Sequence, residues 1–343
     1  MAAPSPDTPT HGPPSPPPTL PDAWDAGGGI PLDGLLERHQ VSPLLLALLP
    51  VVAFVIFFVI SNLASVGLLL WEGIDFAGGA LEFEALIQEH ARSLILANTA
   101  GQVLGLALPA LLMAWLHSSR WGAFLRFRAP DARLLALAIL AWMALLPVVS
   151  WVGELNQLLP LPEAVEVWDA QQMALVEQVL LGDLTIAFSL AMLAVTPALC
   201  EEILFRGYAQ RQAERGMGVA AGILFSGVVF GFFHLRLTQV LPLTLLGIFL
   251  AYLAWRTGSL WIPIVIHFLN NGYAVVLGFW ARGQEAVSLT AIEQVPIPWY
   301  LVVAGAVFFG IVTVAMEHRA RRLVTTAAVT SENAPPADNP KRP

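Results

Sequence analysis

Residues 194–206 read AVTPALCEEILFR, and this stretch decides how the rest of the chain is interpreted. It begins as an apolar run of helical length and ends in two adjacent carboxylates, Glu201 and Glu202, with Arg206 one helical turn beyond the second. Ionisable side chains inside a membrane-spanning helix are costly and by default mark a functional site. The stretch therefore predicts a site within a bilayer, provided that the surrounding sequence crosses one.

The composition supports a membrane protein. Of the 343 residues 57% are hydrophobic and only 12% are charged, which is about half the charged share of an average soluble domain. The formal net charge of −8 lies in loops and tails, and no basic face is present, so nucleic acid is not expected as a partner. The single cysteine, Cys200, excludes an internal disulfide and a multi-cysteine metal site, and we expect it to be a small buried side chain.

Apolar runs of spanning length predict an all-α, polytopic membrane protein with one bundle of about eight helices over residues 41–318. The runs cover residues 43–70, 93–116, 134–152, 184–205, 219–235, 240–256, 259–280 and 299–316. The connector at 154–183 alternates acidic and apolar residues, which favours a helix lying on the membrane surface.

The two ends of the chain differ from the bundle in composition. Residues 1–40 are rich in proline and residues 319–343 are basic and then polar, so both are predicted to be disordered tails. With both termini in the cytoplasm, every Lys and Arg except Arg92, Arg236 and Arg282 falls on the cytoplasmic side, as the positive-inside rule requires. Because arginine greatly exceeds lysine, we expect a bacterial inner-membrane protein.

The fourth and fifth runs predict a helical hairpin. Its turn is expected at 216–218, where glycines permit a tight connection. Glu201 and His234 are equidistant from this turn and should face each other at similar depth. The polar segment after Arg206 must then continue as helix into the cytoplasm. Small residues at positions 218, 222, 227 and 231 would let the backbones approach closely.

Three pairs repeat the helical spacing of four residues: Glu202 with Arg206, Phe230 with His234, and His267 with Asn271. The first pair is more typical of structural support than of catalysis. A carboxylate in a low-dielectric site can act as a general base on water, and imidazole can protonate a leaving amine. His267 and Asn271 offer donors to a developing oxyanion. The pattern therefore predicts hydrolysis of a peptide bond by direct attack of water.

A metal site is the competing interpretation of the same residues. Two histidines and a glutamate could bind zinc, and the ligands would be Glu201, His234 and His267. The helical His-Glu-x-x-His signature is absent, so spacing alone does not decide. The cofactor is therefore either none or a divalent metal such as zinc.

These motifs resemble those of the CPBP family of intramembrane proteases, which includes the type II CAAX prenyl proteases and the Abi proteins. The family pattern Glu-Glu-x-x-x-Arg, Phe-x-x-x-His and His-x-x-x-Asn occurs here in that order on separate predicted helices, within residues 185–280. The resemblance implies an eight-helix bundle with a cavity open to the cytoplasm. By position it implies that Glu201 activates water with help from His234, that His267 and Asn271 stabilise the oxyanion, and that Glu202, Arg206 and Phe230 support the site.

The resemblance leaves the cofactor and the substrate open. Family members are described both as metalloproteases and as metal-independent glutamate proteases. We expect membrane lipids as partners, and as substrate a peptide or the C-terminal segment of a protein, with or without a lipid group. One alternative is a non-enzymatic immunity or scaffold protein of the Abi type. Another is a transporter with a proton relay, but the first half of the chain has no intramembrane charge to mirror the second.

Overall fold

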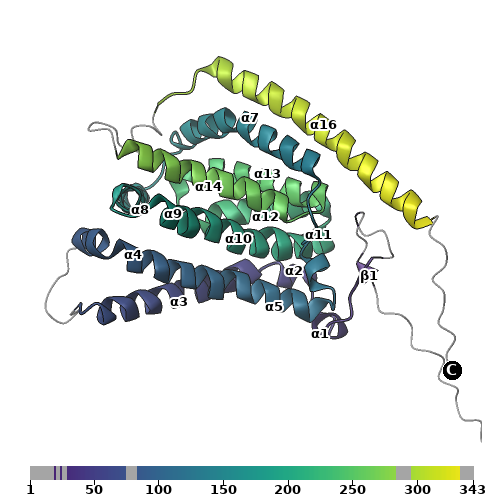
Figure 1. Ribbon diagram of the computed structural model, residues 1–343, viewed down its shortest axis with the longest axis horizontal. Helices are drawn as coiled ribbons and strands as arrows, with labels where there is room; N and C mark the ends of the chain where they lie inside the picture. The colour runs from purple at the N-terminus through teal and green to yellow at the C-terminus, as the bar shows by residue number, and fades with distance from the viewer. Residues whose placement is uncertain (1–18, 21–23, 25–28, 75–82, 283–294, 333–343) are drawn as a thin grey trace, which may run out of the picture.

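The computed structural model describes residues 19–20, 24, 29–74, 83–282 and 295–332, and helices make up most of it (Figure 1). The α-helices are α1 (Leu35–Arg38), α2 (Pro43–Leu46), α3 (Leu49–Trp71), α4 (Phe83–Gly101), α5 (Leu108–His117), α6 (Trp121–Phe124), α7 (Ala132–Asn156), α8 (Glu163–Leu181), α9 (Ile186–Leu190), α10 (Thr196–Glu202), α11 (Gln210–Met217), α12 (Val219–Phe233), α13 (Val240–Thr257), α14 (Trp261–Ala281) and α16 (Trp299–Glu332). Wider π-helical turns form η1 (Gln102–Ala107), η2 (Ala191–Val195) and η3 (Ile203–Ala209), and η4 (Leu237–Gln239) is a short 3₁₀ helix. Two short strands, β1 (Thr19–Leu20) and β2 (Ile30–Pro31), pair antiparallel.

The predicted all-α membrane bundle is confirmed. In the described part of the chain, seven helices are long and apolar enough to cross a membrane. They are Pro43–Trp71, Glu89–His117, Ala132–Asn156, Ile186–Met217, Leu237–Thr257, Trp261–Ala281 and Trp299–Thr326. The remaining predicted span is α12, which has only 15 residues, fewer than the roughly 20 that a full crossing requires. The protein is therefore an integral membrane protein whose fifth apolar helix is short.

The helix that carries the paired carboxylates lies in the interior of the bundle. The segment α9–η2–α10–η3–α11 runs without a break from Ile186 to Met217. It contacts η1 and α5 on one side and α12 and α14 on the other. Beyond these neighbours, α3 packs against α4 at one edge, and α7 packs against α13 and α16 at the opposite edge (Figure 1). This central position shields the carboxylates from lipid on both sides.

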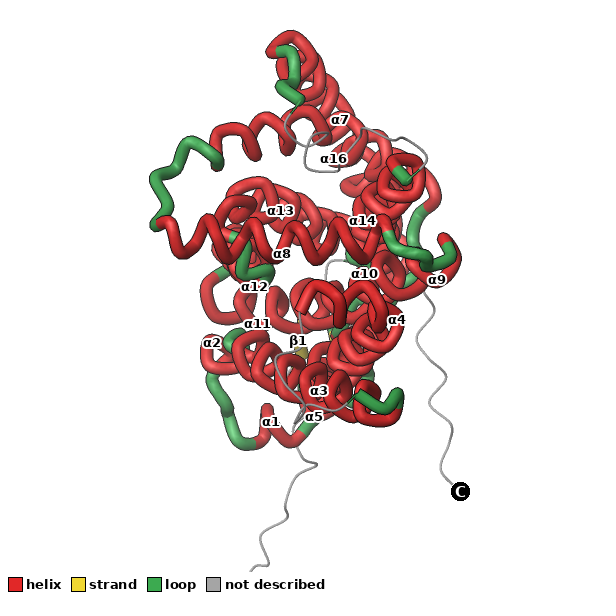
Figure 2. The backbone as a smooth tube through the Cα atoms, turned by 90° about the vertical axis from the view of Figure 1, so that its left-hand side faces the viewer, coloured by secondary structure: helices red, strands yellow, loops and turns green. Residues whose placement is uncertain are grey.

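The predicted connector helix is present as α8. Most helices of the bundle run in one direction, whereas α8 runs across them, as the two views show together (Figures 1 and 2). It contacts α4, α14 and η4. The alternation of acidic and apolar residues in α8 predicted a helix on the membrane surface, and its crosswise direction is consistent with that position.

Both predicted tails are shorter than expected. Within 1–40, Ile30 and Leu32 are buried, and Gly34 N donates to the carbonyl of His117 at 3.0 Å. The prediction of disorder rested on the average composition of residues 1–40, in which two apolar side chains carry little weight beside the many prolines and glycines. At the other end α16 continues past residue 318 to Glu332, and Arg319 pairs with Asp131 at 2.6 Å. Residues 1–18, 21–23, 25–28 and 333–343 lie outside the described part of the chain.

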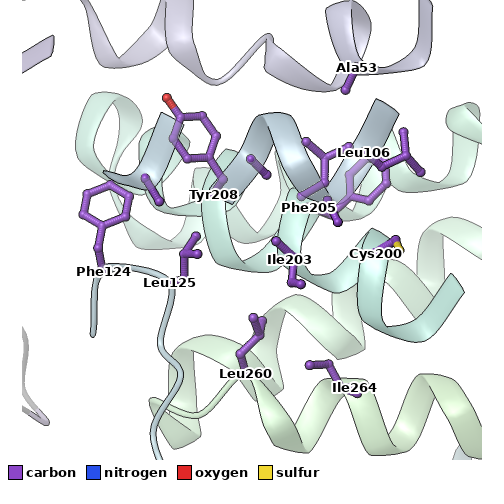
Figure 3. Packing of buried hydrophobic residues seen from close by; sticks show 14 of the residues in the cluster. Ala53, Leu106, Phe124, Leu125, Cys200, Ile203, Phe205, Tyr208, Leu260 and Ile264 are labelled. Atoms are coloured by element: carbon purple, nitrogen blue, oxygen red, sulfur yellow. The ribbon is translucent and has the colours of Figure 1, made fainter. Parts of the chain in front are cut away.

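A compact apolar core surrounds the central helix. Phe205 and Tyr208 of η3 belong to one buried cluster that also includes Leu106 of η1 and Ile264 of α14, and Phe205 lies beside Leu106 (Figure 3). Cys200 is buried within the same cluster, which agrees with its interpretation as a small buried side chain. Close packing of this kind resists local rearrangement and holds the central helix in one position.

Candidate active site

Wide helical turns flank the paired carboxylates. The turn η2 ends just before α10, and the hydroxyl of Thr196 donates to the carbonyl of Ala191, five residues earlier, at 3.0 Å. Pro197 follows, and its missing N–H is one reason for a widened turn at this point. The turn η3 begins directly after Glu202. Such π-helical turns within α-helices frequently accompany functional sites.

The predicted hairpin is present. The polar segment after Arg206 continues as helix to Met217, and Gly218 forms the turn with a φ of 86°. A Cβ atom on Gly222 would lie 2.8 Å from the backbone nitrogen of Glu214. Added Cβ atoms on Gly227 and Gly231 would clash with α13, at Ile248 and Thr244. The glycines of α12 therefore bring it close to two helices, α11 and α13. The sequence predicted close packing only within the hairpin, that is, against the helix that contains α11.

Arg206 and Glu202 form a fully buried ion pair. Nη1 of Arg206 donates to Oε1 of Glu202 at 2.7 Å, and neither side chain is exposed to solvent. Nη2 donates to the carbonyl of Gly247 at 3.0 Å, and the guanidinium lies 4.2 Å from the centre of the Phe230 ring. A buried charge is tolerated only when it is paired and hydrogen-bonded in this way. Sequence reasoning missed Gly247, because a backbone carbonyl leaves no motif.

His267 is held by the same carboxylate. Its Nδ1 donates to Oε1 of Glu202 at 2.9 Å, so the neutral ring presents Nε2 as an acceptor. Nε2 lies 3.3 Å from Nδ2 of Asn271 and 4.0 Å from Oε2 of Glu201. Nδ2 of Asn271 is also 3.5 Å from the carbonyl of Leu193. Glu202 therefore orients His267, and His267 faces Glu201.

Glu201 differs from Glu202 in its surroundings. Its side chain is 11% exposed, and in the described part of the chain it accepts no hydrogen bond, whereas Oε1 of Glu202 accepts two. Oε2 is buried without a partner in both carboxylates. A buried carboxylate oxygen without a partner is unfavourable and needs an explanation, such as a role in catalysis. Glu201 is therefore the carboxylate of this cluster that is free to engage water or substrate.

His234 stands at the end of α12, and its ring is also oriented. Nδ1 donates to the carbonyl of Phe230 at 2.8 Å, which leaves the lone pair on Nε2. The Phe230 ring lies 4.8 Å from the His234 ring and 5.6 Å from the His267 ring, edge-to-face with both. Both Glu201 and His267 are close enough to act on His234 electrostatically. Phe230 therefore separates the two imidazoles and sets their spacing.

The structure thus gathers all seven predicted site residues around one point. Four helical segments supply them, which are α10, η3, α12 and α14. Their roles in a reaction stay predictions. The zinc alternative fits this arrangement poorly, because no group of three His, Cys, Asp or Glu side chains in the described residues could hold a metal ion.

Part of the chain that includes this cluster is similar to known proteins. Residues 183–273 match the family profile "Type II CAAX prenyl endopeptidase Rce1-like", and this segment includes all seven site residues. The match supports the predicted resemblance over these residues, which make up about a quarter of the chain. It is also similar to a protein of Bacillus subtilis (strain 168) named "Putative membrane peptidase YdiL", with 30% identity over 84 residues. That match covers 24% of this chain and about a third, 34%, of the Bacillus protein. No solved structure matches the chain.

Proposed function

We propose that this protein is an intramembrane endopeptidase that uses Glu201 to activate water. One observation carries the proposal: in the described residues Glu201 accepts no hydrogen bond, whereas the adjacent Glu202 accepts two, and Glu201 lies beside two imidazoles whose Nδ1 atoms are bound by other groups. The Rce1-like segment that contains the cluster supports the same reaction class.

The first step is attack on the scissile carbonyl. Glu201 takes a proton from water as the new C–O bond forms, and the carbonyl oxygen becomes an oxyanion. Asn271 is the nearby neutral donor, and its present contacts at 3.3 and 3.5 Å are long. An oxyanion would compete successfully for these N–H groups, because hydrogen bonds to charged acceptors are stronger.

The second step is departure of the amine. The proton taken by Glu201 must reach the leaving nitrogen when the C–N bond breaks. Nε2 of His234 has the free lone pair required to accept this proton and pass it on. His267 is less suited to shuttle protons, since Nδ1 binds Glu202 and Nε2 already faces Asn271. We assign His267 to positioning Asn271 and Glu201.

The substrate and the setting follow from the position of the site. Glu201 lies midway along a 32-residue helix in the bundle interior, so the scissile bond must enter the membrane region. A peptide or the C-terminal segment of a protein, with or without a lipid group, meets this requirement. The arginine distribution supports cytoplasmic termini, which requires the short helix α12 to act as an eighth crossing. The excess of arginine over lysine is typical of a GC-rich bacterial genome, and the setting that we propose is a bacterial inner membrane.

The test is peptide release by the full-length chain in lipid nanodiscs. Membrane proteomics that compares wild-type cells with Glu201→Gln cells would first identify substrates. We expect Glu201→Gln and His234→Ala to insert and melt as the wild type does, while cleavage is lost. Glu317→Gln, which alters a partly exposed carboxylate that binds Tyr252 and Arg256, is the matched control and should cleave normally. Undiminished cleavage by Glu201→Gln would refute the proposal and favour a scaffold or immunity role.

A further inference from the structure

The loop that follows His234 is held by helices outside the Rce1-like segment. That segment covers residues 183–273, whereas α7 and α8 precede it. The loop runs from Leu235 through η4 into the start of α13. His234 is the last residue before this loop, so the position of its imidazole depends on where the loop is held.

The backbone beside His234 is in an unfavourable conformation. Leu235 has a φ of 52°, in the left-handed region that bulky residues rarely adopt. A conformation of this kind persists only when the surrounding structure enforces it, and it is concentrated at functional sites. The contacts that hold the loop are therefore part of what fixes His234.

Asn156 is the first of these contacts. It is the last residue of α7 and is fully buried. Its Nδ2 donates to the carbonyl of Leu237 at 2.9 Å, and its Oδ1 accepts from the backbone nitrogen of Leu241 at 2.8 Å. The side-chain amide of Asn156 therefore binds the backbone on both sides of η4, at its first residue and in the first turn of α13.

Asp169 is the second contact, and it comes from the crosswise helix α8. Its side chain is buried, and Oδ2 accepts from the backbone nitrogen of Thr238 at 2.7 Å. Met173, one turn later on α8, accepts from Nη2 of Arg236 at 3.5 Å. Burial of an acidic side chain costs free energy. In the described residues Oδ1 of Asp169 has no partner, and the hydrogen bond that Oδ2 accepts comes from this loop.

We infer that Asn156 and Asp169 are positioning residues, which act through the loop 235–241 to hold His234 at the distance from Glu201 that proton transfer needs. This inference rests on the proposed function. It assigns a role in the reaction to α7 and α8, which lie outside the Rce1-like segment. Displacement of a reacting group by about 1 Å can reduce a rate by about a hundred-fold, so loss of either contact should be measurable in kcat.

The experiment compares variants of the full-length protein in nanodiscs. Asp169→Ala removes the bond to Thr238, and Asp169→Asn keeps an oxygen that can accept it. Glu154→Ala is the matched control. Glu154 is an acidic residue near Asn156 at the end of α7, and it accepts a hydrogen bond at 2.8 Å from the backbone nitrogen of Ile297, which lies outside the loop 235–241. Asn156→Leu removes the bonds of Asn156 to Leu237 and Leu241. If that variant does not fold, the Asp169 pair decides alone.

We expect Asp169→Ala to lower kcat by about ten-fold to a hundred-fold with little change in KM, and to increase amide hydrogen exchange in residues 235–241. Asp169→Asn should restore both, and Glu154→Ala should resemble the wild type. A normal kcat in Asp169→Ala, or equal losses in Asp169→Asn and Asp169→Ala, would overturn the inference. A wild-type chain that cleaves no peptide would instead refute the proposed function, and the inference with it.

Discussion

Two clusters in the described part of the chain combine a carboxylate, a guanidinium and an imidazole, and they differ in how many of their buried polar atoms have a partner. In the central cluster Glu202 joins Arg206 to His267. Nearer the Met217 end of the same long helix, Glu37 joins Arg215 to His117, at 2.8 and 2.6 Å. Both arrangements place a carboxylate between a guanidinium and an imidazole. Each therefore pairs the opposite charges that it brings together.

The difference lies in what surrounds the two imidazoles. His117 binds Glu37 through Nδ1, while Nε2 contacts both Tyr208 at 3.1 Å and Gln212 at 2.7 Å. In the described residues every buried polar atom of this end cluster has a partner. In the central cluster Oε2 of Glu202, Nε of Arg206 and Oε2 of the neighbouring Glu201 have none, and His267 faces Glu201. A complete cluster stabilises the fold, and an adjacent unsatisfied carboxylate distinguishes the one that we propose to be catalytic.

Glu201→Gln should produce the largest effect. We expect cleavage to fall by a factor of about 10²–10⁴, the usual contribution of a general base, with little change in thermal stability. Single-turnover cleavage in nanodiscs measures the first quantity and thermal unfolding in detergent the second. A large loss of stability with unchanged cleavage would show that the central cluster, like the end cluster, serves only to stabilise the fold.

Glu202→Ala should mainly affect folding. The substitution leaves Arg206 buried without its partner, and removal of one member of a buried pair costs about 3–5 kcal/mol. Unfolding in a denaturing detergent, compared with Glu317→Ala as a partly exposed carboxylate, measures this cost. If both variants lose the same small amount, the central ion pair is not a stabilising element.

Acidification should weaken the end cluster. Burial opposes ionisation of Glu37, but hydrogen bonds from His117 and Arg215 outweigh it and hold the pKa of this carboxyl below its usual value. A lowered pKa in the folded state contributes stability above the unfolded pKa, which is lost as pH falls through the folded value. Thermal midpoints should therefore drop below about pH 4.3 in the wild type, and less steeply in Glu37→Gln. Identical pH profiles would contradict this role of Glu37.

Tyr208→Phe should have the smallest effect. It removes the hydroxyl contact to His117 and keeps the ring that packs in the core, so we expect a loss of about 0.5–1.5 kcal/mol. Gln212 remains bound to Nε2 of His117. Cleavage by this variant, measured beside Glu201→Gln, should match that of the wild type. A strong catalytic defect would mean that the end cluster participates in the reaction.

The sequence alone determined much of the central site, because its geometry is local. Helical spacing paired Glu202 with Arg206, and the distances of Glu201 and His234 from Gly218 placed them at one level of a hairpin. Hydropathy identified the apolar helices for the same reason, since each one must be long and apolar by itself. These features need no knowledge of distant parts of the chain.

Only the tertiary structure decided which groups from distant segments complete these helices. The carbonyl of Gly247 accepts from Arg206, Glu202 selects the tautomer of His267, and Asn156 and Asp169 hold the loop after His234. Each contact joins residues more than 40 positions apart, and such partners are chosen by packing and leave no spacing in the sequence. The lack of a hydrogen-bond partner for Oε2 of Glu201 is also a tertiary feature, because it depends on the positions of all the surrounding side chains.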